Sequence, residues 1–263
     1  MTSNAPWHEL LASPGTDRHI AQTYQEERFL MEAVGIYASA GLSHEQGVLL
    51  IATQAHLQAF DNYFVRAGID VDAAKQSGRL LEITAETLLP EIMVNGLPDP
   101  ETFKRCVESA LAKAEAASGA KGLRIYGELV NVLWLAGNFA GAMALEELWN
   151  RLQKTRPFTL FCAYKMDSLE TGCAGSFQSL CQSHTHLIPA EHYNHLNAAV
   201  ETAAEGILGS VVAKEMQELS KEKEDSLAEM PAGQKMLLWL RKNIPVSADA
   251  IADRSRERYQ ELT

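Results

Sequence analysis

A cysteine and two histidines stand close together in the stretch CQSHTHLIP, at Cys181, His184 and His186. Thiolate and imidazole groups are good ligands for zinc and iron. The spacing matches no standard zinc finger, although His192 and His195 follow closely and could complete a ligand set. The other interpretation is a buried cysteine with histidines that cap a strand-to-helix connection. We therefore expect no cofactor and keep a metal site at Cys181, His184 and His186 as an alternative.

A carboxylate follows an apolar run in LRIYGEL (123–129), at Glu128. If this run is a strand of a parallel sheet, Glu128 lies at its carboxyl end, where such sheets bind ligands. Gly127 would let backbone or a ligand approach closely. Two interpretations stay open: the acid faces a crevice and binds a polar group, or it is a partly buried structural acid paired with Arg124 or His19.

Other reactive side chains have structural interpretations. Glu146 and Glu147 are predicted to lie on a solvated or ion-paired helix flank. Cys162 falls within the apolar run FTLFCAY, where cysteine is usually a small buried hydrophobic residue. Cys106 lies on a predicted amphipathic helix, and we give it the same interpretation. There is no GxSxG motif, and we assign no catalytic residue.

Phosphate-binding motifs are also absent from the sequence. Neither GxxxxGK[ST] nor GxGxxG occurs, although a nucleotide-binding α/β domain uses such loops to cradle phosphates. The first predicted strand instead leads into Tyr24-Gln25-Glu26-Glu27-Arg28. Two carboxylates at a helix start interact well with the helix dipole and repel a phosphate. A phosphate site at this junction is therefore not expected.

Composition narrows the class of protein. The chain has 263 residues and a formal net charge of -11, so direct binding to nucleic acid is not expected. No apolar run approaches the roughly 20 residues that cross a bilayer, and no secretory signal is recognised. The four cysteines form no CxxC pair or disulfide framework, which predicts a cytoplasmic protein.

Strand-like and helix-like patterns alternate along most of the chain. Strands are predicted at 19–24, 47–53, 78–84, 123–129 and 157–164. Helices are predicted at 26–40, ending at Gly41, and at 56–67, 85–94, 100–118 and 138–154. This alternation predicts the α/β class, with a mostly parallel sheet between two layers of helices.

Three regions are predicted. Residues 1–17 form a flexible leader, residues 18–190 the α/β domain, and residues 191–263 a helical C-terminal extension. Within the extension, MPAGQKMLLWLRKNIP (230–245) is an amphipathic helix, whose apolar face must dock on the main domain or on another chain.

Several segments, in order, resemble the MEDS family, the methanogen/methylotroph DcmR-type sensory domain. They are HIAQTYQEERFLMEAVGIYASAGLSHEQGVLLIAT, AGIDVDAAKQSGRLLEITAETLL, RIYGELVNVLWLAGNFAGAMALEELWN, FTLFCAYKM and CQSHTHLIP. The resemblance implies a RecA/KaiC-like domain that has lost its Walker A loop. It also implies sensing of small hydrocarbon-derived ligands, in proteins such as transcription regulators or beside histidine kinases. Candidate ligand-binding residues within these motifs are His19, Tyr24, Arg124, Glu128, Tyr164, His184 and His186, together with Gly127, Cys162 and Cys181.

The sequence thus predicts a cytoplasmic, non-catalytic sensory or regulatory protein. It would bind a small ligand or a protein partner, such as a kinase or a transcription regulator, and the C-terminal helices would relay the state. One alternative is a divergent nucleotide-binding, ATPase-like enzyme in which Glu128 orients water. Another is an oligomeric interaction module that assembles into a homo-oligomer.

Overall fold

The computed structural model describes residues 6–167, 169, 179–180, 182–188, 191–221 and 232–262. The chain forms two compact units. The first comprises Met1–Ala21 and Glu26–Lys165, and the second comprises Gln22–Gln25 and Met166–Thr263. In the described part of the chain, every helix is too short or too polar to cross a membrane.

A six-stranded sheet has the strand order β3-β2-β6-β7-β1-β8. The strands are β1 (His19–Tyr24), β2 (Gly47–Ala52), β3 (Leu80–Thr84), β6 (Leu123–Gly127), β7 (Thr159–Lys165) and β8 (His186–Ile188). β2 pairs in parallel with β3 and β6, and β6 pairs in parallel with β7. Every residue of β1, β2 and β6 is buried, as expected for strands covered on both faces. β8 and residues 22–24 of β1 are grouped with the second unit.

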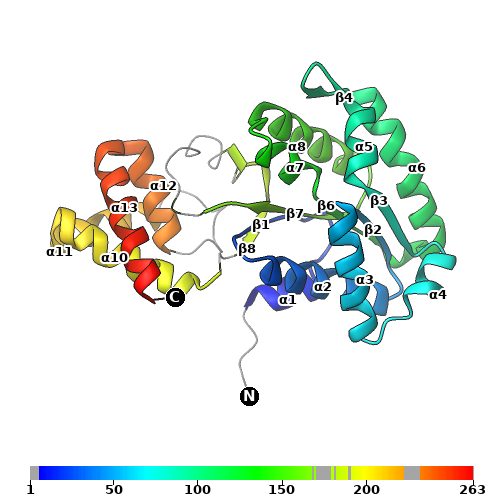
Figure 1. Ribbon diagram of the computed structural model, residues 1–263, viewed down its shortest axis with the longest axis horizontal. Coiled ribbons are helices and arrows are strands. Elements are labelled where there is room, and N and C mark those ends of the chain that lie inside the picture. The colour runs from blue at the N-terminus through cyan, green and yellow to red at the C-terminus, as the bar shows by residue number, and fades with distance from the viewer. Residues whose placement is uncertain are drawn as a thin grey trace. The chain divides into compact units, whose positions relative to one another are not determined.

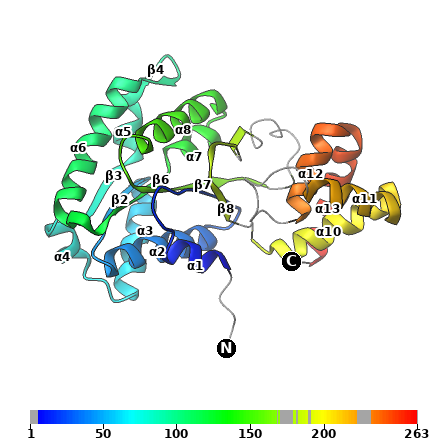
Figure 2. The same ribbon diagram turned by 180° about the vertical axis from the view of Figure 1, so that it is seen from behind.

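Helices cover both faces of the sheet in the first unit. They are α1 (Pro6–Ala12), α2 (Glu27–Ser43), α3 (Gln54–Arg66), α4 (Val71–Gln76), α5 (Ala85–Ile92), α6 (Pro100–Ser118), α7 (Leu129–Leu135) and α8 (Phe139–Gln153), with a 3-10 turn at Gly119–Lys121. Figures 1 and 2 show α1, α2 and α3 on one side of the sheet and α5, α7 and α8 on the other. The predicted three-layer α/β fold is therefore confirmed.

The predicted helix 85–94 ends early, at Ile92. The next residues form a short antiparallel pair, β4 (Met93–Val94) and β5 (Leu97–Pro98). Asn95 and Gly96 join the two strands with φ angles of 51° and 83°. An Asn-Gly pair with both φ angles positive is the preferred two-residue hairpin turn, so this turn ends the helix.

Residues 6–12 form helix α1 in place of the predicted flexible leader. Leu11 is fully buried. Arg124, also buried, donates from its guanidinium to the carbonyl oxygens of Leu11 at 2.8 Å and Ala12 at 3.0 Å. These bonds satisfy carbonyl groups at the end of α1 and connect this helix to β6, which carries Arg124.

Gly41 does not end α2, which runs on to Ser43. A Cβ atom on Gly41 would lie 2.8 Å from Cδ of Arg124. This separation is too short for carbon atoms in van der Waals contact. The glycine therefore makes room for a buried arginine, a packing role rather than the helix stop predicted from sequence.

The second unit contains the predicted C-terminal helices: α10 (Tyr193–Leu208), α11 (Ser210–Lys221), α12 (Ala232–Asn243) and α13 (Pro245–Leu262). They appear in yellow to red in Figure 1. Met236, Leu237 and Leu240 on α12 are buried in a core that also contains residues of α10 and α13. The apolar face of α12 is thus covered within its own unit, which corrects the expected docking on the main domain or on another chain.

Candidate functional site

The carboxyl ends of β2 and β6 place Glu128 beside the start of α3. Ile51 and Gly127 are partners in the parallel register, so the residues that follow them meet at one edge of the sheet. Glu128 is only 2% exposed. Its Oε2 accepts a hydrogen bond from the Thr53 backbone N–H at 3.0 Å, and its Oε1 lies 2.7 Å from Nδ1 of His56.

Both ring nitrogens of His56 face carboxylate oxygens. Nδ1 lies 2.7 Å from Glu128, and Nε2 lies 3.0 Å from Oε2 of Glu27. Only the imidazolium form can donate from both nitrogens. The hydrogen bond to Glu128 raises the pKa of His56, although partial burial acts in the opposite direction. His56 is therefore held as a cation between two acids.

Lys165 extends this arrangement to the end of β7. Its ammonium lies 2.6 Å from Oε1 of Glu27, and its backbone N–H donates to the Asn131 side-chain oxygen at 2.8 Å. Glu128, His56, Glu27 and Lys165 thus form a chain of alternating charges, here called the strand-end network. It joins α2 and α3 to the ends of β6 and β7, and its outer members are accessible to solvent.

The backbone donors beside the strand-end network already have acceptors in the chain. Thr53 N–H donates to Glu128, Gln54 N–H lies 3.2 Å from both oxygens of Glu86, and His56 N–H lies 3.4 Å from the Thr53 hydroxyl oxygen. These N–H groups at the start of α3 are what a helix offers a phosphate. An incoming phosphate would have to displace carboxylates of the protein itself.

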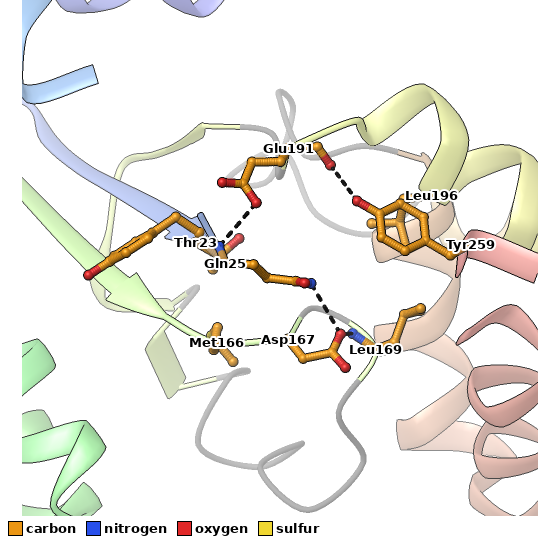
Figure 3. A pocket seen from close by; sticks show the side chains of 9 residues that line it. Thr23, Gln25, Met166, Asp167, Leu169, Glu191, Leu196 and Tyr259 are labelled. Atoms are coloured by element: carbon orange, nitrogen blue, oxygen red, sulfur yellow. Dashed lines mark hydrogen bonds between the residues drawn. The ribbon is translucent and has the colours of Figure 1, made fainter. Parts of the chain in front are cut away.

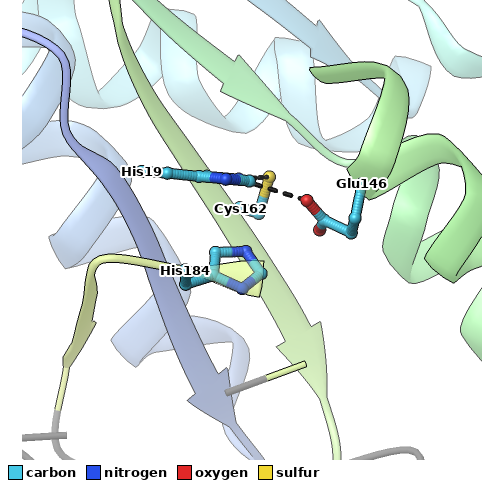
Figure 4. A group of neighbouring side chains, drawn as sticks. All are labelled: His19, Glu146, Cys162 and His184. Atoms are coloured by element: carbon cyan, nitrogen blue, oxygen red, sulfur yellow. Dashed lines mark hydrogen bonds and ion pairs between the residues drawn. The ribbon is translucent and has the colours of Figure 1, made fainter. Parts of the chain in front are cut away.

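A second group of reactive side chains lies inside the first unit, between the sheet and α8. His19 on β1, Cys162 on β7 and Glu146 on α8 are each at most 1% exposed. Figure 4 shows the three side chains pointing toward one another. Nε2 of His19 lies 3.1 Å from Oε2 of Glu146 and 3.5 Å from Sγ of Cys162. We call these three residues the buried cluster.

Two further residues hold the buried cluster in place. Nδ1 of His19 lies 2.9 Å from the side-chain oxygen of Asn150, one turn beyond Glu146 on α8. The hydroxyl of Tyr164 on β7 donates to Oε1 of Glu146. Polar groups therefore tie β1 to α8 and β7, which lie more than 100 residues further along the chain.

The buried cluster is unsuited to nucleophilic catalysis. Burial and the nearby Glu146 raise the pKa of Cys162 well above that of an ordinary thiol. A reactive cysteine needs the opposite shift, because the thiolate is the nucleophile. The cysteine, histidine and asparagine resemble the residue types of a cysteine protease site, but the thiol is protonated and closed off from solvent.

The structure separates several residues that the sequence placed together. Glu128 is paired with His56 and not with Arg124 or His19. Arg124 is the second residue of β6, at the other end of the strand, where it also donates to Gln46. Those bonds give Arg124 a structural role, and ligand binding by Arg124 stays a prediction. His19 belongs to the buried cluster, and Tyr164 donates to its Glu146.

Glu146 corrects another expectation. It is buried, so the predicted solvated flank is wrong for this residue, whereas Glu147 is exposed and pairs with Arg151. The sequence held a signal for this difference, since Glu146 shares one helical stripe with the buried Ala142 and Trp149. The pairing of Glu128 with His56 also had a signal, because both follow strands predicted to be parallel.

Tyr24 belongs to the second unit and is one of the residues that line a small cleft. Figure 3 shows this cleft from close by. Gln25 N–H donates to Glu191 Oε2 at 3.1 Å, and the Tyr259 hydroxyl donates to the Glu191 carbonyl at 3.1 Å. The cleft has a volume of about 10 Å³, which is room for one water molecule. It is too small for an organic ligand.

The histidines of CQSHTHLIP have local partners in the second unit. Nδ1 of His184 lies 2.7 Å from the Leu180 carbonyl oxygen, and Nδ1 of His186 lies 2.9 Å from the Thr185 hydroxyl. Such contacts agree with the capping interpretation. Cys181 lies outside the described residues, so the metal alternative at Cys181, His184 and His186 stays a prediction.

One family model matches a region of the chain that contains both groups of residues. A family model described as MEDS, the methanogen/methylotroph DcmR sensory domain, matches residues 18–185. The chain belongs to the MEDS family. The match includes the whole strand-end network and the whole buried cluster, so both lie within the MEDS region of the chain. A search of curated proteins gave no match.

Proposed function

We propose that this MEDS protein is a non-catalytic cytoplasmic sensor that binds a small uncharged or cationic ligand at the strand-end network. The ligand-bound state would pass to a protein partner, such as a kinase or a transcription regulator. Support for sensing comes from the family match, and support for the place comes from the network at the carboxyl ends of the strands.

The strand-end network carries the proposal because it combines a buried anchor with accessible groups. Glu128 is 2% exposed, while the side chains of His56, Glu27 and Lys165 are 19%, 49% and 43% exposed. A ligand with a hydrogen-bond donor can replace His56 or Lys165 as the partner of the Glu27 carboxylate. The buried Glu128 would keep His56 in position during this exchange.

The charges of the site select the class of ligand. Glu27 is the first residue of α2, and the carboxylate of Glu86 on α5 faces the start of α3, so both acids occupy positions where a phosphate would otherwise bind. An anion would meet these carboxylates, whereas an amine or a hydroxyl group would find acceptors. The same arrangement argues against the ATPase-like alternative, because acids of the protein occupy the positions that would bind the phosphates and both oxygens of Glu128 already accept hydrogen bonds within the chain.

Signalling would follow from the elements that the strand-end network joins. Its members belong to α2 and α3 and to the ends of β6 and β7. A ligand that breaks the contact between Glu27 and His56 removes one of the interactions that hold α2 against α3. Such a change produces a signal when a partner binds the two arrangements with different affinity.

The test compares ligands and a matched acid variant. Thermal unfolding of the full chain is measured with short alkylamines, short alcohols and Mg-ATP, and each stabilising compound is followed by calorimetry. Glu27→Gln removes the accessible acid of the network. Glu45→Gln is the control, because Glu45 is also an exposed acid paired with a lysine, Lys121, but it precedes β2 at the opposite edge of the sheet.

An amine or an alcohol should stabilise the wild-type protein and Glu45→Gln, and it should stabilise Glu27→Gln much less. Mg-ATP should give no binding heat. Saturable binding of Mg-ATP would contradict the proposal. So would a panel without any stabilising compound, or stabilisation that survives Glu27→Gln unchanged.

A further inference from the structure

We propose that the buried cluster of His19, Cys162 and Glu146 is a binding site for a divalent transition metal ion, with zinc as the best-fitting ion. Its ligand set differs from the Cys181, His184 and His186 set considered from the sequence. It is also independent of the proposed sensory function, because a metal at this position does not depend on ligand binding at the strand-end network.

The three side chains offer one nitrogen, one sulfur and one carboxylate oxygen. These are the donor types that zinc accepts, and a mixed set with a thiolate favours zinc or a similar transition metal over magnesium or calcium. The ligand atoms all lie within 4.8 Å of one another. They come from β1, β7 and α8, so a bound ion would connect three elements of the first unit.

Two of the three separations between ligand atoms match those around a tetrahedral ion. Bonds of about 2.0 Å to nitrogen and oxygen and about 2.3 Å to sulfur place an N,O ligand pair about 3.3 Å apart and an N,S pair about 3.5 Å apart. The observed distances from His19 Nε2 are 3.1 Å to Glu146 Oε2 and 3.5 Å to Cys162 Sγ. His19 therefore needs little movement relative to Glu146 or Cys162 to bind the ion.

The neighbouring residues orient the ligand atoms. With Nδ1 of His19 donating to Asn150, Nε2 is the nitrogen that carries the lone pair, and it points toward Glu146 and Cys162. Tyr164 donates to the other oxygen of Glu146. Hydrogen bonds of this kind on the far side of a ligand fix its tautomer and its orientation in metal sites.

Charge balance points the same way. The Cys162 thiol would lose its proton only on binding the ion, since a metal ligand must be deprotonated, and the buried thiolate and Glu146 carboxylate would then need a compensating cation. A divalent ion bound by Glu146 and Cys162 as anions and by neutral His19 neutralises the cluster. The competing arrangement without metal is a hydrogen-bonded group in which a proton of His19 lies between Glu146 and Cys162, and the experiment distinguishes the two.

The experiment measures the metal directly. The full chain is purified without a metal-affinity tag, and its zinc content is measured by mass spectrometry. The chelated protein is then titrated with Co²⁺. Bound cobalt should show a thiolate-to-cobalt charge-transfer band, and about one ion per chain should bind, as expected for one site.

Matched variants assign the ligands. Cys162→Ser should abolish the charge-transfer band, whereas Cys106→Ser, at a partly exposed free cysteine on α6, should keep it. Glu146→Gln should weaken cobalt binding, whereas Glu147→Gln should leave it unchanged. Asn150→Ala should lower the affinity by about 10- to 100-fold, the usual effect of removing a partner that orients a ligand.

Two results would overturn the proposal. One is wild-type protein that contains no zinc and shows no charge-transfer band with Co²⁺, a result that does not depend on any variant folding. The other is a band that persists in Cys162→Ser. If that band is also lost in Cys181→Ser, the result would favour the set predicted from the sequence.

Discussion

Replacing Glu128 by glutamine keeps the size of the side chain and removes the charge that holds His56 as a cation. Glu128 accepts hydrogen bonds from His56 and from the Thr53 N–H. Each bond that involves a charged group is worth about 1.5–3 kcal/mol. Glutamine retains one acceptor oxygen, but its amide N–H group must face one of the two donors. We therefore expect Glu128→Gln to lower the free energy of unfolding by about 2–4 kcal/mol at mildly acidic pH.

The loss should depend on pH. The folded protein raises the pKa of His56, mainly through its hydrogen bond to Glu128. The resulting stability is fully present below the unfolded pKa of histidine, about 6.5, and disappears as the pH rises through the higher folded pKa. In Glu128→Gln the main cause of the shift is gone, so the folded pKa falls toward the unfolded one. The stability gap between wild type and variant should therefore be larger at low pH and smaller above the folded pKa.

Urea unfolding at about pH 6 and about pH 9 measures this gap, and an NMR titration of the His56 ring reports its pKa directly. Glu86→Gln is the control, because Glu86 also accepts from a backbone N–H at the start of α3, that of Gln54, and its carboxylate is not a partner of His56. The control should leave the pKa of His56 in place. An equal His56 pKa in wild type and Glu128→Gln, or a gap that grows with pH, would refute the reasoning.

Three further substitutions test the packing, each by urea unfolding or hydrogen exchange. Gly41→Ala should cost about 1–3 kcal/mol, because the new methyl group meets Arg124; a neutral result would contradict the close contact. Arg124→Met should speed amide exchange in α1, since two carbonyl groups at its end lose their donor, and unchanged exchange would argue against this anchor. Leu237→Ala, at a site only 1% exposed, should cost about 2–5 kcal/mol, whereas Val246→Ala, at 83% exposure, should stay within about 0.5 kcal/mol; equal effects would contradict the C-terminal core.

Local sequence patterns predicted the elements well where one periodicity dominates. The apolar run at 47–53 became β2, and the helical stripe at 100–118 became α6 with the predicted bounds. Burial on both faces gives a strand such as β2 a continuous apolar sequence, which no polar alternation obscures. The likeness to RecA and KaiC proteins stays a prediction, because the structure establishes the three-layer α/β fold without that finer assignment.

The buried cluster depended on information that the sequence did not show directly. His19 and Cys162 are 143 positions apart and meet because β1 lies beside β7 in the sheet. Strand order in a parallel sheet is set by long crossover connections and not by local pattern. Glu146 was misassigned for a different reason, since a charged residue on a helix is usually solvated. Only the position of Glu146 on the buried stripe of α8 distinguishes it from Glu147.

The sequence predicted the position of one residue of the strand-end network and missed the other three. The strand-end position expected for Glu128 is found, because it follows from one apolar run and the direction of a parallel strand. His56, Glu27 and Lys165 were missed, since each becomes a neighbour only when β2, β6 and β7 are placed side by side. Arg124 looked like the natural partner in sequence. It lies at the far end of the same strand, because it is only the second residue of β6.

The central claim is that a small uncharged or cationic ligand binds beside His56. The most direct measurement follows the ring nitrogens of His56 by NMR in the ¹⁵N-labelled full chain. The protein is titrated with the alkylamine or alcohol that stabilises it most, and separately with Mg-ATP. We predict saturable shifts of the His56 nitrogens with the amine or alcohol and none with Mg-ATP. Shifts caused by Mg-ATP, or a stabilising compound that leaves the His56 nitrogens unmoved, would contradict the account.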